Sequence, residues 1–172
     1  MRKTVDGWAE LETVRSDVIS VCSVRAGTGV FGIDMRRIRE VLGKTLLQRV
    51  PLAPEYIAGV APYRGEVLTT LSLRALLVME ESEAASYVVV MEDMEYGDLL
   101  GLAVDGMAGV AMVSERTREA NPSTLDERSK ALFAGAYQIG TGLVAMLDPS
   151  QLRHSRLVEC GIFDRRTERN ER

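Results

Sequence analysis

The chain has 172 residues, a hydrophobic content of 46% and a formal net charge of -4. This length fits one domain or two small subdomains packed together, and it excludes a large multidomain enzyme. Acidic residues outnumber basic ones by 25 to 21. Because no dense basic patch could follow a phosphate backbone, we expect no nucleic-acid partner.

The cysteines and the apolar runs limit the chain further. Cys22 and Cys160 lie far apart and form no CxxC pair, which predicts no metal site, no disulfide framework and a reducing cytoplasm. No apolar run approaches the roughly 20 residues that span a bilayer, and the best candidate is interrupted by Asp105. We therefore expect no direct insertion into a membrane.

The first strong pattern is that of a β-hairpin. The β-branched run DVISVCSV at 17–24 is followed, after a Gly-Thr-Gly turn, by VFGID at 30–34. The same segment places Gly27, Gly29 and Gly32 in the G-x-G-x-x-G pattern of dinucleotide-binding proteins. That pattern needs a helix that opens within the glycine run, whereas VFGID is typical of an extended strand. The hairpin is the preferred interpretation, and a small nucleotide-binding enzyme using these glycines is the lesser alternative.

The next segment, DMRRIREVLG at 34–43, predicts a short amphipathic helix. Asp34 can cap its start and Gly43 can end it. The charged residues between them would be exposed, either as a solvated face or as a docking surface. Three residues form the expected apolar face: Ile38, Val41 and Leu42.

Short apolar runs separated by glycines and polar turns fill the rest of the chain. Within 53–60, Pro54 stands where the first turn of a helix tolerates it. Residues 80–86 are acidic and polar and form the clearest internal boundary between two halves of the chain. The runs with strand character are 46–50, 65–73, 86–92, 98–107, 109–115 and 133–148. Many short strands between glycine turns predict a mostly β fold of small barrels or a sandwich.

No set of residues predicts catalysis. The single histidine, His154, has no nucleophile spaced around it and is interpreted as a solvated helix residue. Cys22 alternates with valines in a strand and is interpreted as a small core residue. The carboxylates are scattered, so none are paired at a catalytic separation. We therefore expect no catalytic residue, no metal and no cofactor.

The stretch GVAPYRGEV at 59–67 contains the best interaction candidates. Gly65 can supply the positive φ of a tight turn, which places Tyr63 and Arg64 near the apex. Tyrosine and arginine are enriched at interface hot spots. Tyr63 and Gly65 are therefore candidates for a turn or an interface, with the Arg64 guanidinium held out beside them.

From about Val18 to Leu157, the chain resembles the CheW-like coupling proteins of bacterial chemotaxis. The most similar block is FGIDMRRIREVLGKTLLQRVPLAPEYIAGVAPYRGEVLTTLSLR. There the family typically has an apolar-Asp step, a Val/Ile-x-Glu element, a proline-bounded segment, Gly-Val-x-x-x-Arg-Gly and a Leu-Arg close. Downstream, GLAVDGM resembles the family's Val-Asp-Gly segment. Relatives often have Asn-Leu where this chain has Pro62 and Tyr63.

The resemblance implies a mostly β fold. Two SH3-like five-stranded β-barrels would pack around a shared hydrophobic core, with short helices between strands. We expect a single CheW-like domain at 15–158, with approximate halves 15–80 and 85–158 between which strands can be exchanged. An N-terminal extension at 1–14 and a charged, disordered tail at 159–172 would flank it.

The resemblance also implies a non-catalytic adaptor of a chemosensory pathway. Its partners would be the regulatory domain of a CheA-type histidine kinase and the cytoplasmic tip of a chemoreceptor. By position, Ile38, Glu40 and Arg64 match residues associated with receptor coupling, and Gly59 matches a glycine needed for kinase coupling. The adaptor would be cytoplasmic and recruited to membrane receptor arrays through its partners. A paralogous scaffold of a pilus-motility or other chemosensory system is the alternative.

Overall fold

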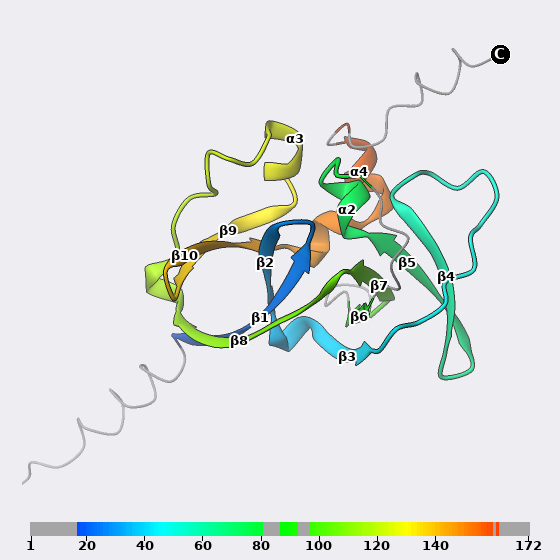
Figure 1. Ribbon diagram of the computed structural model, residues 1–172, viewed down its shortest axis with the longest axis horizontal. Helices are drawn as coiled ribbons and strands as arrows, with labels where there is room; N and C mark the ends of the chain where they lie inside the picture. Colours follow the sequence, from blue (N-terminus) through cyan, green and yellow to red (C-terminus); the bar gives the residue numbers. More distant parts are fainter. Residues whose placement is uncertain (1–16, 81–86, 93–96, 160, 162–172) are drawn as a thin grey trace, which may run out of the picture.

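The computed structural model describes residues 17–80, 87–92, 97–159 and 161 (Figure 1). The expected N-terminal extension lies outside these residues. So do residues 81–86 of the expected internal boundary and most of the expected tail. Within the described part of the chain, no helix is long and apolar enough to cross a bilayer.

The described strands form two five-stranded sheets, which we name barrel A and barrel B (Figure 1). Barrel A has the strand order β8-β1-β2-β10-β9, and barrel B has the order β3-β6-β7-β5-β4. The strands of barrel A are β1 (Val18–Ala26), β2 (Gly29–Asp34), β8 (Gly106–Ser114), β9 (Phe133–Ile139) and β10 (Gly142–Leu147). Those of barrel B are β3 (Ile38–Leu42), β4 (Ile57–Tyr63), β5 (Glu66–Ser72), β6 (Tyr87–Glu92) and β7 (Leu99–Val104). Barrel A therefore joins strands that are far apart in the sequence, whereas barrel B is one continuous stretch.

Short helical segments lie between the strands and after the last one. In the described part of the chain, three are α-helical: α2 (Leu73–Leu76), α3 (Glu127–Lys130) and α4 (His154–Glu159). Three are 3-10 turns: η1 (Met35–Arg37), η2 (Glu115–Thr117) and η3 (Pro149–Leu152). Most of them begin at an aspartate or serine whose side chain accepts a backbone N–H of the first turn.

The two barrels share one pairing pattern. In each strand order, the third and fourth strands pair parallel and every other neighbouring pair is antiparallel. One isolated bridge in each barrel joins the segment after the first strand of the order to the last strand: Glu119 to Ala136 in barrel A, and Gln48 to Val60 in barrel B. These bridges bring the two sheet edges together, and the predicted fold of two five-stranded SH3-like barrels is confirmed.

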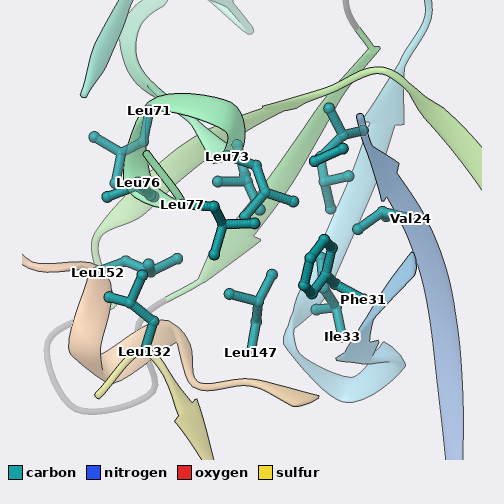
Figure 2. Close-up of a cluster of buried hydrophobic side chains, with 14 of the residues drawn as sticks. Val24, Phe31, Ile33, Leu71, Leu73, Leu76, Leu77, Leu132, Leu147 and Leu152 are labelled. Carbon is teal, nitrogen blue, oxygen red and sulfur yellow. The ribbon is translucent and has the colours of Figure 1, made fainter. Parts of the chain in front are cut away.

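The main hydrophobic core lies between the barrels (Figure 2). There, Val24, Phe31 and Ile33 of barrel A lie opposite the leucines of α2 and barrel B. The Phe31 ring also stacks on Phe133, with 5.5 Å between ring centroids. Smaller clusters fill the barrel interiors: Ile19, Val21, Val113, Tyr137 and Met146 in barrel A, and Tyr63, Leu68, Val88 and Val90 in barrel B. The shared core fixes one barrel against the other.

The predicted helix at 34–43 is wrong. The structure has the single turn η1, followed directly by β3. The cap was predicted correctly, because the Asp34 carboxylate accepts a hydrogen bond from the Arg36 backbone N–H at 2.9 Å. Beyond this turn the chain pairs with β6, with Val41 opposite Val89. Pairing with a buried strand outweighs the marginal stability of so short a helix.

Two further expectations between β3 and β4 are wrong. Residues 46–50 form no strand and contribute only the bridge of Gln48 to Val60. The expected helix start at Pro54 is a turn, in which the Ile57 N–H donates to the Pro54 carbonyl at 2.8 Å. The chain then enters β4.

Candidate interaction site

Three of the residues singled out from the sequence meet where the edges of barrel B come together. Glu40 lies on β3, and Tyr63 and Arg64 lie at the tip of the β4–β5 hairpin. The Tyr63 hydroxyl and the Arg64 Nη2 donate to the same Glu40 oxygen, at 2.9 and 3.0 Å. The Arg64 guanidinium also lies over the Tyr63 ring, 5.3 Å from its centroid. We call these three residues the Arg64 cluster.

The geometry of the hairpin tip explains why the Arg64 side chain projects into solvent. Tyr63 pairs with Glu66, so Arg64 and Gly65 form a two-residue turn. Their φ angles are 51° and 86°, as a type I′ turn requires. Gly65 adopts this geometry without steric cost, but an arginine at positive φ is strained. The sequence interpretation of Gly65 as the turn glycine is therefore confirmed.

Burial separates the members of the cluster. The Arg64 side chain is 74% exposed, so its planar fork is accessible to a carboxylate of a partner. Tyr63 is only 8% exposed and belongs to the core of barrel B. The expected place of Tyr63 near the apex is thus only partly right, because it ends β4 with its ring turned inward. Tyr63 therefore holds Glu40 from the interior side of barrel B, through its hydroxyl group.

The electrostatics of the cluster keep Glu40 ionised. Hydrogen bonds from Tyr63 and then Arg64 lower the pKa of the Glu40 carboxyl. Burial, followed by the bond to Glu40, raises the pKa of the Tyr63 hydroxyl, which therefore remains a donor. The arrangement presents one exposed cation braced by a carboxylate and an aromatic ring. Such a surface suits recognition and contains no nucleophile.

Ile38 and Gly59 lie near the cluster but outside it. Ile38 is half-buried on β3 and packs against the main core. Gly59 is buried in β4 at a φ of 149°, where an added Cβ would lie 2.6 Å from the Gln48 carbonyl oxygen. Gln48 and Val60 exchange two backbone hydrogen bonds of 2.9 Å beside it. Gly59 therefore permits the contact that closes barrel B, and it presents no side chain to a partner.

One polar network was missed from the sequence. Asp105, directly after β7, accepts hydrogen bonds from Arg74 Nε at 2.8 Å and Arg74 Nη2 at 2.7 Å. It also accepts the backbone N–H of Gly27, in the β1–β2 turn of barrel A, at 2.7 Å. The Leu-Arg close and the Val-Asp-Gly segment noted above carry these two side chains, but spacing alone does not show that they meet.

This network ties the barrels to each other. Burial acts to raise the pKa of Asp105, but the hydrogen bonds from Arg74 and Gly27 outweigh it, so the pKa lies below the ordinary 3.8. Asp105 is ionised at neutral pH, and its charge joins α2 to the first hairpin. The interaction is half-buried, so solvent screens it less than an exposed ion pair.

The glycines of the dinucleotide pattern serve the hairpin. Gly27 takes a φ of 57° at the first position of the β1–β2 turn, which suits a type II′ geometry. Gly32 lies within β2, where an added Cβ would collide with the Met146 sulfur. The chain continues into a strand after these glycines, so no helix begins there to hold a pyrophosphate. The hairpin interpretation is confirmed.

The other candidate groups show no catalytic arrangement. Cys22 is buried in β1, as a core residue should be. His154 lies on α4, as expected, and its Nδ1 is 2.5 Å from the Tyr56 hydroxyl. These two rings border a pocket of about 440 Å³ that is mostly apolar. Among the described residues, no cluster of three or more His, Cys, Asp or Glu could hold a metal ion.

Comparisons with known proteins agree with this geometry. Residues 20–156 match the family model described as CheW-like domain. The chemotaxis protein CheW of Rhizobium meliloti strain 1021 is 26% identical over 124 residues, which cover 72% of this chain and 80% of that protein. The chemotaxis protein CheW of Treponema pallidum is 22% identical over 151 residues, covering 83% and 86%.

A solved structure shows the same fold. The scaffolding protein TtCheW from Thermoanaerobacter tengcongensis superposes with a TM-score of 0.67 at 20% identity, over 76% of this chain and 84% of that one. The family match covers most of the chain. It begins within β1 and includes every other described strand in full. The chain therefore belongs to the CheW-like domain family.

Proposed function

We propose that this scaffold couples the cytoplasmic tips of chemoreceptors to the regulatory domain of a CheA-type histidine kinase. It would act in the cytoplasm and reach membrane receptor arrays only through these partners. The observation that carries the proposal is Arg64, an exposed cation held at a strained backbone angle and braced by Glu40. Strain of this kind concentrates at functional sites.

The proposed roles follow from the positions of the residues. Arg64 would contact a carboxylate of the receptor, and Glu40 would orient the guanidinium. Ile38 would contribute its partly exposed edge from the same strand. Gly59, which is buried, would affect kinase coupling indirectly by allowing barrel B to close at Gln48.

A paralogous scaffold of a pilus-motility or other chemosensory system is a second candidate. The residues next to Arg64 favour it, because Pro62 and Tyr63 stand where relatives often have Asn-Leu. The chemistry of the Arg64 cluster would be the same, but the receptor would differ. Co-purification from the native cell would distinguish the two.

The test is Arg64→Glu, measured as binding to purified receptor tips from the same organism. We expect affinity to fall at least tenfold, because the substitution reverses the charge and places it beside Glu40. The control is Arg156→Glu, since Arg156 is also exposed and pairs with a glutamate, Glu159, at 3.0 Å. Wild-type receptor affinity in Arg64→Glu would overturn the proposal. A variant that fails to fold would show that Arg64 is structural.

A further inference from the structure

The two donors of the Arg64 cluster converge on one oxygen of Glu40. The Tyr63 hydroxyl and the Arg64 Nη2 both donate to Oε2, at 2.9 and 3.0 Å. Within the described part of the chain, no hydrogen bond or ion pair reaches the other oxygen, Oε1. The Glu40 side chain is 40% exposed, so Oε1 can accept a hydrogen bond from a donor outside the chain.

The Arg64 guanidinium is also only partly used. Nη2 makes the bond to Glu40, whereas Nε and Nη1 donate to no group among the described residues. Arginine has five N–H donors in a planar fork, so most of them remain available to a partner. Figure 1 shows the β4–β5 tip that carries Arg64 at the edge of barrel B away from barrel A. The site therefore offers an anionic acceptor and cationic donors side by side.

This pairing of charges decides which partner chemistry fits. Glu40 and Arg64 carry opposite charges, so the sum of their charges is zero. A lone carboxylate that approaches Arg64 also approaches Glu40, and repulsion offsets much of the attraction. A partner that carries a carboxylate beside an ammonium or guanidinium group instead places each charge next to its opposite. Such a reversed pair satisfies both side chains together.

Tyr63 fixes the position of the two charges. Its side chain is only 8% exposed and packs in the interior of barrel B, so the core of the barrel sets where its hydroxyl lies. The hydroxyl bonds to Glu40, and the ring faces the Arg64 guanidinium at 5.3 Å. One buried side chain therefore contacts both charges. Such preorganisation lowers the entropy that two long surface side chains would lose when a partner binds.

We propose that Tyr63 is a positioning residue that holds Glu40 and Arg64 as a fixed pair of opposite charges, and that the receptor presents the reversed pair to them. The carboxylate of that pair would accept from the unused donors of Arg64, and its cation would donate to Glu40 Oε1. This inference rests on the proposed function, which assigns the Arg64 cluster to the receptor. It adds the chemistry that the receptor surface must present there.

The first experiment is Tyr63→Phe in the full chain, with purified receptor tips from the same organism as the probe. Phenylalanine keeps the ring beside Arg64 and removes the hydroxyl donor. We expect at least threefold weaker receptor binding, and no further loss when the same change is made in a Glu40→Ala chain, because Tyr63 acts through Glu40. An NMR titration should also show the pKa of Glu40 rising toward its ordinary 4.5, since the bond from Tyr63 is the main cause of its lowering.

The matched control is Tyr137→Phe. Tyr137 is also buried, at 2% exposure, and its hydroxyl also interacts with a glutamate, Glu115, but in barrel A. This variant should leave both the receptor affinity and the pKa of Glu40 unchanged. A general loss of packing from a missing tyrosine hydroxyl would affect the two variants alike.

The second experiment, Glu40→Gln, tests the partner chemistry by the direction of its effect. Glutamine keeps an oxygen to which Tyr63 and Arg64 can donate, but it removes the negative charge. The cation of a reversed pair would lose its partner, so we expect at least threefold weaker binding. A lone carboxylate would instead be relieved of repulsion and would bind equally or more tightly. Glu159→Gln removes the same charge from the exposed pair with Arg156 and should leave binding unchanged.

The outcomes separate this inference from the proposed function. Wild-type chain that does not bind receptor tips, or Arg64→Glu that binds them as wild type does, would overturn both. The inference alone is wrong if Arg64→Glu weakens binding while Tyr63→Phe changes neither the receptor affinity nor the pKa of Glu40. Equal or tighter binding by Glu40→Gln would show that the receptor presents a lone carboxylate, and it would also overturn the inference alone.

Discussion

Barrels A and B have the same strand pairing, yet their equivalent hairpin tips differ. In barrel A, Gly140 and Thr141 join β9 to β10, and Gly140 takes the positive φ of 60°. In barrel B, Arg64 and Gly65 join β4 to β5, and both are at positive φ. Each turn requires a left-handed first residue, but only barrel A supplies a glycine for it. The turn geometry itself therefore does not require the arginine of barrel B.

The barrels agree where the fold itself sets the requirement. Gly135 in β9 and Gly59 in β4 both have positive φ, at 133° and 149°. Both lie against the carbonyl oxygen of the residue that closes their barrel, Glu119 or Gln48. A requirement repeated in both barrels is structural, whereas the arginine confined to barrel B is not part of that shared requirement.

The largest effects should come from breaking this shared requirement. Gly59→Ala and Gly135→Ala would each place a Cβ within 2.6 to 2.8 Å of a backbone oxygen, at a φ that alanine rarely adopts. We expect each to lower the free energy of unfolding by about 3 kcal/mol. Urea denaturation of both variants measures this loss.

The control for this pair is Gly43→Ala, since Gly43 has open space around its Cβ position and no positive φ. It should leave stability nearly unchanged. If either alanine variant is as stable as this control, the glycine of that barrel is not needed for its closure. The structural equivalence of the two barrels would then fail.

A second pair of glycines allows the packing inside the two barrels to be compared. Gly101 in β7 and Gly32 in β2 occupy equivalent positions beside the parallel strand pair, and an added Cβ would collide with Thr70 or Met146. Thr70 is β-branched and fully buried, whereas the Met146 sulfur ends a flexible chain. We expect Gly101→Ala to cost about 2 kcal/mol and Gly32→Ala about 1 kcal/mol.

Thermal unfolding of the two alanine variants would measure this difference. Gly142→Ala, at a position with nothing nearby, is the control. An equal loss of stability at both sites would mean that the side chains around Gly32 cannot shift to make room for a Cβ. Val21 would be the reason, because it also lies close to that position. The proposed difference between the barrel interiors would then be wrong.

Local patterns of sequence predicted part of this architecture. The first hairpin follows from its β-branched runs and its glycine turn, and the Gly65 turn follows from the need for positive φ. The helix expected at 34–43 failed because its spacing describes only local propensity. Pairing of β3 with the buried strand β6 decides that segment, and no local pattern shows the partner strand.

Long-range contacts could not be predicted from spacing. Gly59 meets Gln48 only because barrel B closes, and Asp105 meets Gly27 across 78 residues of sequence. The resemblance to CheW-like proteins predicted the two barrels and singled out Gly59. The structure adds what that glycine contacts, the Gln48 carbonyl oxygen that a Cβ would strike.

Asp105→Asn tests whether the two barrels depend on each other. It removes the charge that Arg74 and the Gly27 N–H bind, so we expect a loss of about 1 to 2 kcal/mol at pH 7. The native pKa of Asp105 is lowered by Arg74 and Gly27 against the opposing effect of burial. The stabilisation is therefore fully present above the ordinary pKa of 3.8 and is lost as pH falls through the lower native value.

Stability curves of wild type and Asp105→Asn should thus converge as the solution becomes acidic. Glu127→Gln, which disrupts an exposed pair with Lys130, should change stability little at any pH. A constant gap between wild type and Asp105→Asn across the acid range would show that the carboxylate charge does not join the barrels.

The smallest effect, and the sharpest test of the hairpin tips, comes from Arg64→Gly. This variant gives barrel B the glycine that barrel A already has, so relief of strain should exceed the entropy that glycine costs and raise stability by about 0.5 kcal/mol. Gly140→Ala makes the reverse change and should cost about 1 kcal/mol. Differential scanning calorimetry measures both.

If Arg64→Gly is instead destabilising, the interactions of Arg64 with Glu40 and Tyr63 outweigh its backbone strain, and the arginine is explained by folding. If it is stabilising and also loses receptor binding, the arginine is kept at a cost to the fold for the sake of its partner.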